Sequence, residues 1–169
     1  MKHTIKAKQN NSKNCLVCGM ENNLGLKTRF YETENDEVIA LFTPDEIHQS
    51  YPGITHGGIS SAILDETIGR AIMARYDEQV WGVTLELNLR YKKAVPLGVE
   101  LKAIGRITAE RGPIFEGTGE ILLPDGEVAV SCTGKYLKRK IHDIANDSFS
   151  DNEWFPVEDE PVLDEVDLP

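Results

Sequence analysis

The alternation of apolar and polar side chains predicts two strands ahead of one long helix. In residues 27–42 apolar and polar positions alternate in two runs, and the turn Glu34-Asn35-Asp36 separates them. Asp45 is placed to cap a short helix that ends before Pro52. Residues 56–76 contain no proline and are rich in Ala, Ile and Leu, which predicts the long helix.

Four further strands are predicted after this helix. They cover residues 80–91, 99–109, 113–123 and 127–137. The turn Leu123-Pro124-Asp125-Gly126 joins the last two. Short links between the last strands require antiparallel neighbours, so we expect the four strands in meander order. One long helix on an antiparallel sheet is an α+β layout.

The composition is that of an ordinary globular domain. The 40% hydrophobic residues and 14 glycines of this 169-residue chain together make about 48% apolar positions. A domain of this length buries roughly 68–70% of its unfolded surface, so it needs neither a disulfide nor a metal ion to fold. No apolar run approaches the roughly 18 residues of a membrane span. Three cysteines, an odd number, fit a reducing compartment, and we expect a soluble, cytoplasmic protein without membrane contact.

The negative charge is concentrated at one end of the chain. Of the 28 acidic residues, ten lie from Asp143 onward, where there is no Lys or Arg. The remaining 18 acidic residues equal the 18 basic ones, so the net charge of −10 belongs to the tail. The body shows no strong basic face, and we therefore expect no nucleic-acid partner.

These patterns divide the chain into three parts. Residues 1–14 are polar and are expected to form a flexible N-terminus. Residues 15–141 form the predicted domain, and residues 142–169 an acidic C-terminal tail. We expect most of the tail to be disordered. Its apolar residues, among them Trp154 and Val166, leave docking on the body as the alternative.

Asp65 is the most informative residue of the long helix. At about 100° per residue it falls on the apolar side of the helix, between Ala62 and Ile68, opposite a polar seam that includes Ser60 and Thr67. A carboxylate there is costly unless it is paired or protonated, and such sites often raise a carboxyl pKa and mark function. The alternative is a structural hydrogen bond to the backbone or to a neighbouring strand.

The tripeptide His56-Gly57-Gly58 stands where this helix begins. Glycines at a helix start leave the free backbone N–H groups unobstructed, and these favour an oxygen that gains negative charge. A simple loop-to-helix turn explains the same tripeptide. Gly58 and Asp65 are seven residues apart, which is about 10 Å along the axis. If both act on one substrate, Asp65 must come from a second copy, so the spacing predicts a twofold dimer with two composite sites.

The stretch from Tyr51 to Glu66, Tyr-Pro-Gly-Ile-Thr-His-Gly-Gly-Ile-Ser-Ser-Ala-Ile-Leu-Asp-Glu, resembles the signature of hot-dog fold thioesterases. The most similar branch holds the phenylacetate-pathway and 4-hydroxybenzoyl-CoA thioesterases. The following segment from Trp81 to Tyr91 also resembles the family. The resemblance implies a long central helix wrapped by a curved antiparallel sheet, paired edge to edge into a homodimer or homotetramer.

The resemblance also implies roles for individual residues. The N–H of Gly57 or Gly58 polarises the carbonyl of an acyl-CoA thioester, and His56 shapes that site. Asp65 of the other subunit is the nucleophile or the general base that delivers water. Thr84, in the next strand, orients the acid or the water. The implied reaction is hydrolysis to a carboxylic acid and CoA, with no cofactor.

Further residues are candidates for substrate binding. Several relatives carry Asn or Gln six residues before the histidine, whereas this chain has Ser50 there with Gln49 beside it. Arg111, in a tight turn, and Arg106 are candidates for the CoA phosphates. The acyl group is expected between the helices of two subunits, along residues such as Ile59, Ile63 and Ile68.

Other interpretations remain open at this point. A non-catalytic acyl-CoA sensor and an enoyl-thioester hydratase are alternatives on the same fold. Cys15-x2-Cys18 is half of a zinc pattern, but no standard spacing supplies the other ligands, so we expect no metal and a pair of small apolar residues. His48 and His142 are expected at the surface.

Overall fold

The computed structural model describes residues 1–145, 149–158 and 162–169. Its elements, in chain order, are β1 (Lys2–Lys8), β2 (Asn11–Ser12), β3 (Arg29–Thr33), β4 (Val38–Phe42), η1 (Glu46–His48), α1 (Gly57–Tyr76), β5 (Trp81–Tyr91), β6 (Leu101–Arg111), β7 (Ile114–Leu122), β8 (Val128–Arg139), η2 (Ile141–Asp143), α2 (Phe149–Asn152), β9 (Trp154–Phe155) and β10 (Glu165–Asp167). The predicted hairpin, helix and four later strands are all present, which confirms the α+β layout.

Eight of the described strands form one large antiparallel sheet in the order β10-β1-β3-β4-β6-β7-β8-β5, and β2 and β9 form a separate small sheet. The predicted meander is right for β6, β7 and β8 but wrong for β5, which pairs with β8 at one end of the sheet. The segment from Lys92 to Glu100 separates β5 from β6, and it is long enough to cross to the far side of the meander. As a result, β5 is an edge strand.

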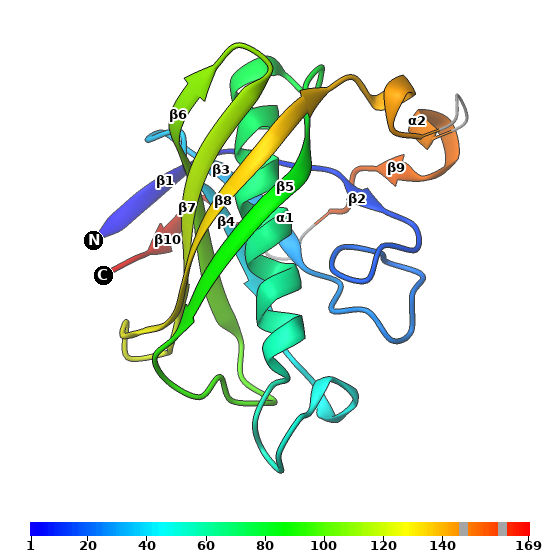
Figure 1. Cartoon of the computed structure of the whole chain (residues 1–169). Helices are drawn as coiled ribbons and strands as arrows, with labels where there is room; N and C mark the ends of the chain where they lie inside the picture. Colours follow the sequence, from blue (N-terminus) through cyan, green and yellow to red (C-terminus); the bar gives the residue numbers. More distant parts are fainter. Residues whose placement is uncertain (146–148, 159–161) are drawn as a thin grey trace.

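The sheet curves around α1, which lies across its inner face (Figure 1). Helix and sheet approach very closely at Gly105, where an added Cβ atom would lie 2.6 Å from the carbonyl oxygen of Thr67. At Gly117 the same atom would lie 2.5 Å from the Ile68 side chain. Only glycine fits such contacts, and the side chains between α1 and the strands form the main core.

The polar seam of the helix is buried. Ser60, Thr67 and Arg70 are all buried, because the sheet and the N-terminal segment cover this side of α1. The Thr67 hydroxyl donates to the carbonyl of Ile63, 2.6 Å away, and Arg70 donates to the carbonyl of Asn10 at 2.9 Å. Thr67 and Arg70 therefore have hydrogen-bond partners inside the fold, whereas the buried Ser60 hydroxyl has none among the described residues.

The N-terminal segment belongs to the sheet, contrary to the expectation of a flexible stretch at residues 1–14. Strand β1 lies between β3 and β10, and Asn11 pairs with Phe155 in the small β2-β9 sheet. The side chain of Asn11 also donates to the carbonyls of Cys18 and Thr28, both at 2.8 Å. Partners far away in the sequence order this polar segment, and local periodicity does not reveal them.

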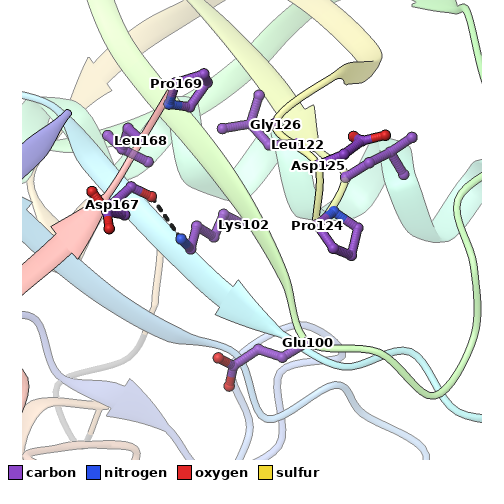
Figure 2. A pocket seen from close by; sticks show the side chains of 10 residues that line it. Glu100, Lys102, Leu122, Pro124, Asp125, Gly126, Asp167, Leu168 and Pro169 are labelled. Carbon is purple, nitrogen blue, oxygen red and sulfur yellow. Dashed lines mark hydrogen bonds between the residues drawn. The ribbon is translucent and has the colours of Figure 1, made fainter.

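Two strands of the C-terminal tail dock on the body, because β9 pairs with β2 and β10 pairs with β1, so the docking alternative holds for these segments. Val166 and Leu168 are buried in a second cluster on the outer face of the sheet. The carbonyl of Asp167 accepts a hydrogen bond of 2.6 Å from Lys102 (Figure 2). The acidic residues Asp147, Asp159 and Glu160 lie outside the described residues.

The histidine predictions were half right. His142 is exposed, but His48 is buried. Both ring nitrogens of His48 have partners that offset its burial, because Nδ1 accepts from the Asp45 N–H at 2.9 Å and Nε2 lies 2.8 Å from the Leu24 carbonyl oxygen. Asp45 caps η1 as expected. Within the described ranges, the helices lack the length and apolar content that crossing a membrane requires.

Candidate active site

Asp65 lies in the middle of α1 and is partly buried against β5. The hydroxyl of Thr84 donates to Asp65 Oδ1 over 2.7 Å, so the structure brings together the two residues that the sequence analysis paired. A β-bulge between Thr84 and Glu86 interrupts the pairing of β5 with β8 at this point. Such bulges often re-aim side chains next to a site. The hydroxyl of Tyr136 donates to the backbone carbonyl of Asp65 over 3.1 Å.

Burial raises the pKa of Asp65 above its ordinary value, and the hydrogen bond from Thr84 opposes this shift. Burial and the Asp65 charge likewise raise the pKa of Cys132, to about 11. A carboxyl group buried as Asp65 is holds a proton more tightly than an exposed one. That is the property required of a general base.

A cavity of about 310 Å³ opens beside the Asp65 carboxyl group. Its apolar wall comes from β5, α1 and the tail, and Trp81 and Trp154 meet edge to face with ring centres 4.8 Å apart. The full lining is Ser12, Cys15, Cys18, Asp65, Glu66, Gly69, Arg70, Met73, Trp81, Gly82, Thr84, Tyr136, Phe149 and Trp154. Ile63 and Ile68, expected to line the acyl site, lie instead in the core of the single subunit, fully buried.

The start of α1 is an open helix N-terminus. His56 is its N-cap, and Nδ1 of His56 accepts a hydrogen bond of 2.9 Å from the N–H of Gly58. The hydroxyl of Tyr91, the last residue of β5, donates to the Gly57 carbonyl over 2.8 Å and fixes the first turn. The Gly57 N–H is a first-turn donor, which a helix leaves without an internal acceptor.

The two halves of the predicted site are separated within one subunit, as the spacing requires. Gly57 and Asp65 lie on the same straight helix, about 12 Å apart along its axis. Beside them, edge strand β5 presents Leu85 and Tyr91 with about half of each side chain exposed. The alternation in residues 80–91 therefore does not produce the buried face expected of an inner strand.

The candidate binding residues lie in three different places. Ser50 and Gln49 are exposed in the loop before α1, where Gln49 Oε1 accepts from the Gly53 N–H at 3.2 Å. Arg111 lines a pocket of about 300 Å³ at the β6-β7 turn. Arg106 is held by Glu37 and Glu120, each at 2.8 Å, which satisfies its charge inside the subunit. The role of Arg106 as a phosphate ligand is not supported by this geometry.

Two basic residues near the helix start escaped the sequence analysis. Lys92 and Lys93 line a pocket of about 350 Å³ together with Gly57 and Tyr91. The sequence signal that could have identified them is a pair of consecutive lysines directly after a predicted strand. A separate pocket of about 250 Å³ lies between the tail and the β7-β8 turn, and it shares no lining residue with the Asp65 cavity (Figure 2).

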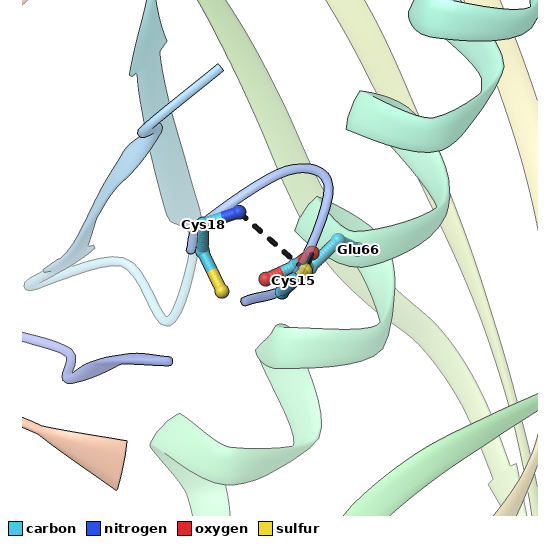
Figure 3. Close-up of side chains that lie close together, drawn as sticks. All are labelled: Cys15, Cys18 and Glu66. Carbon is cyan, nitrogen blue, oxygen red and sulfur yellow. Dashed lines mark hydrogen bonds between the residues drawn. The ribbon is translucent and has the colours of Figure 1, made fainter. Parts of the chain in front are cut away.

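The cysteine pair of the N-terminal loop lies against α1. Cys15 Sγ donates to Glu66 Oε2 at 3.2 Å, and Cys18 is buried beside it (Figure 3). Both cysteines and Glu66 belong to the lining of the Asp65 cavity. No sequence pattern connected Glu66 with the cysteines.

Comparison with known proteins identifies a related family. Residues 52–130 match the family model of the thioesterase superfamily. Acyl-coenzyme A thioesterase THEM4 of Rattus norvegicus is 34% identical over 79 residues, which are 46% of this chain and 33% of the relative. The chain thus spans about a third of the length of the curated relative that it matches.

Solved structures share the fold. A thioesterase superfamily protein, RHA08564, superposes with a TM-score of 0.65 at 30% identity, over 73% of this chain and 59% of the other. The protein smu.793 of Streptococcus mutans, bound to acetyl CoA, gives a TM-score of 0.57 at 19% identity, over 62% of this chain and 82% of the other. These likenesses confirm the hot-dog fold.

Proposed function

We propose that this chain, whose residues 52–130 belong to the thioesterase superfamily, hydrolyses acyl-CoA thioesters to a carboxylic acid and free CoA. The observation that carries the proposal is the Asp65 carboxyl group, partly buried at the edge of a cavity and held by Thr84. A carboxylate fixed in this way attacks a thioester carbonyl or removes a proton from the attacking water. The acyl-CoA thioesterases among the relatives support the same reaction.

The complete site is a composite of two subunits. Asp65 of one subunit acts on a carbonyl that the partner binds at its own His56-Gly57-Gly58. The N–H of Gly57 faces the oxygen where negative charge develops, and the positive end of the helix dipole adds to this stabilisation. The exposed apolar side chains of edge strand β5, Leu85 and Tyr91, supply a surface for this pairing.

The remaining parts of the substrate have matching surroundings. The acyl group enters the Asp65 cavity, whose apolar wall includes Trp81 and Trp154. Its volume of about 310 Å³ lies at the small end of ligand pockets, which favours a short or an aromatic acyl group. Lys92, beside the helix start, and Arg111 carry charges suited to the phosphates of CoA.

The test measures release of free thiol from acetyl-, hexanoyl-, palmitoyl-, phenylacetyl- and benzoyl-CoA. Asp65→Asn keeps the shape of the side chain and an acceptor for Thr84 but removes the base. We expect turnover of at least one substrate to fall about 100-fold or more in this variant, which corresponds to about 2.7 kcal/mol of barrier.

Asp77→Asn is the matched control. Asp77 caps the C-terminus of the same helix in a left-handed conformation, which Asn also adopts, and it is exposed. This variant should keep full turnover. Binding of CoA esters without release of thiol by the unaltered chain would contradict hydrolysis and support an acyl-CoA sensor. Loss of an enoyl chromophore without thiol release would indicate a hydratase.

A further inference from the structure

Three potential metal ligands meet in the N-terminal loop and on α1. Cys15 Sγ, Cys18 Sγ and one carboxylate oxygen of Glu66 all lie within 4.8 Å of one another. In a tetrahedral zinc site, two sulfur ligands lie about 3.8 Å apart and a sulfur and an oxygen about 3.6 Å apart. Shifts of about an ångström in the side chains bring these atoms to such distances. Figure 3 shows the three side chains close together, with the Cys18 N–H directed at Cys15.

The loop has the form of a metal-binding turn. The N–H groups of Val17 and Cys18 both point at Cys15 Sγ, with nitrogen–sulfur distances of 3.3 Å and 3.5 Å. Such donors stabilise a thiolate. The turn closes so tightly that a Cβ atom at Gly19 would lie 2.4 Å from the Cys15 carbonyl oxygen. Gly19 is therefore required for the geometry that aims both sulfur atoms at α1.

Glu66 is oriented by a partner of its own. Arg70, one turn later on α1, binds Glu66 Oε1 at 2.9 Å and leaves Oε2 directed at Cys15. Arg70 is itself buried and stacks on Phe30, with its guanidinium carbon 4.0 Å from the ring centre. An outer partner that fixes a ligating carboxylate is a regular feature of metal sites.

The charges of this cluster also suit a divalent cation. A dication bound by two thiolates and one carboxylate gives a net charge of −1, and Arg70 brings the total to zero. Low dielectric surroundings favour such neutral assemblies.

We propose that Cys15, Cys18 and Glu66 form a binding site for one zinc ion per chain. Binding displaces the protons of both thiols, so one Zn²⁺ enters, two Zn–S bonds form and two protons leave. Thiolate ligands select zinc over the harder magnesium and calcium ions. The three ligands leave a fourth position, which faces the cavity that they share with Asp65, and water completes the tetrahedron. The inference does not depend on the proposed hydrolysis.

The bound ion has a structural consequence. It fastens the N-terminal loop to the middle of α1, next to Asp65 in the sequence. Because the site is absent from the unfolded chain, zinc binding adds to the stability of the folded state. The same two thiols could instead form a disulfide, a competing outcome that the experiment distinguishes.

The test uses the full chain, purified with a reductant and stripped with a chelator. Separate samples of this metal-free chain are titrated with Zn²⁺ and with Co²⁺. We expect one Zn²⁺ per chain, release of up to two protons, and a rise in Tm on the order of 5 °C at 100-fold excess over Kd. Co²⁺ should give the near-ultraviolet charge-transfer band of thiolate ligation. Cys18→Ser and Glu66→Gln should each weaken binding about 10-fold or more.

Cys132→Ser is the matched control, because Cys132 is buried near Asp65 but lies outside the cluster. It should bind zinc as the unaltered chain does. Failure of the reduced chain to bind Zn²⁺, unchanged binding in Cys18→Ser, or a Cys15–Cys18 disulfide that persists in reductant would each overturn the proposal. If the variants fail to fold, the cobalt spectrum of the unaltered chain decides, since a band without thiolate character contradicts the site.

Discussion

Asp65 combines two opposing influences on one carboxyl group. Burial disfavours its charged form and raises its pKa, while the Thr84 hydroxyl donates a hydrogen bond of 2.7 Å to the charged form and limits the rise. The proposed base is active only when ionised, so kcat/KM for thioester hydrolysis should rise with pH through the pKa of Asp65. The position of this acid limb thus reports the balance between the two influences.

Changing Thr84 should move the acid limb in a known direction. Thr84→Val removes the hydrogen bond and keeps the shape, so the pKa of Asp65 rises and the limb shifts to higher pH. Thr84→Ser retains a hydroxyl and should leave the limb near its original position. The measurement is kcat/KM of each variant between about pH 4 and about pH 9. A limb that is identical in both variants would show that Asp65 does not control it.

The raised pKa of Asp65 makes the free energy of unfolding fall with rising pH, whereas the activity rises. Because the folded pKa of Asp65 is raised, the folded chain holds its proton more tightly than the unfolded chain. The free energy of unfolding therefore falls as pH rises from the unfolded pKa through the folded one, and this contribution is lost above that window. Asp65→Asn cannot titrate, so its stability relative to the unaltered chain should increase across the same window. Urea denaturation at several pH values measures the difference, and a difference that is constant with pH would contradict the burial effect.

At the scale of elements, the contact of α1 with the sheet depends on missing side chains. Gly105→Ala places a methyl group 2.6 Å from the Thr67 carbonyl oxygen, which the backbone can avoid only by moving. We expect the free energy of unfolding to fall by about 1–3 kcal/mol. Gly69→Ala adds the same methyl group within α1, 3.4 Å from the Tyr136 ring, an ordinary contact. Because alanine favours a helix interior by about 1 kcal/mol, this control should be neutral or stabilising. Equal losses in both variants would contradict a specific close approach.

The elements also show which parts of the structure were accessible from sequence. The hairpin, α1 and the later strands have strong periodicities and turn residues, so local pattern predicted them. Strand β1 is polar, and its order comes from β3 and β10, which no local pattern indicates. The acidity of the tail favoured disorder for most of its length. Val166 is nevertheless buried against an apolar face of the sheet, which exists only in the folded chain.

Some residues of the candidate site could be predicted from the sequence, and others could not. Asp65 was found because a charge on the apolar side of a helix contradicts the local period. The family resemblance implied that Thr84 orients the acid or the water, and in the structure Thr84 donates a hydrogen bond to Asp65. Glu66 and Cys15 are 51 positions apart, and their contact depends on how the N-terminal loop crosses α1. Such a pairing requires the tertiary structure.

At the scale of the whole molecule, one subunit holds both halves of the proposed site far apart from each other. Gly57 and Asp65 occupy fixed positions on a single helix, and no rotation of side chains closes about 12 Å between them. Edge strand β5 connects the two halves, since Thr84 contacts Asp65 and Tyr91 contacts Gly57. In the proposed twofold dimer, a partner docked along β5 in antiparallel register would bring its own Gly57 towards Asp65.

This arrangement predicts complementation between two inactive variants. Gly57→Pro removes the proposed N–H donor, and it suits the first position of α1, because proline is favoured there and His56 has the extended backbone that must precede it. Asp65→Asn removes the base. Each homodimer should be inactive, but a heterodimer purified through two different tags has one intact site and should recover about half of the wild-type turnover. If each subunit used its own Gly57 and Asp65, both sites of the heterodimer would carry one defect and no activity would return. A heterodimer as inactive as its parents would therefore exclude the composite site while leaving the Asp65 chemistry itself untouched.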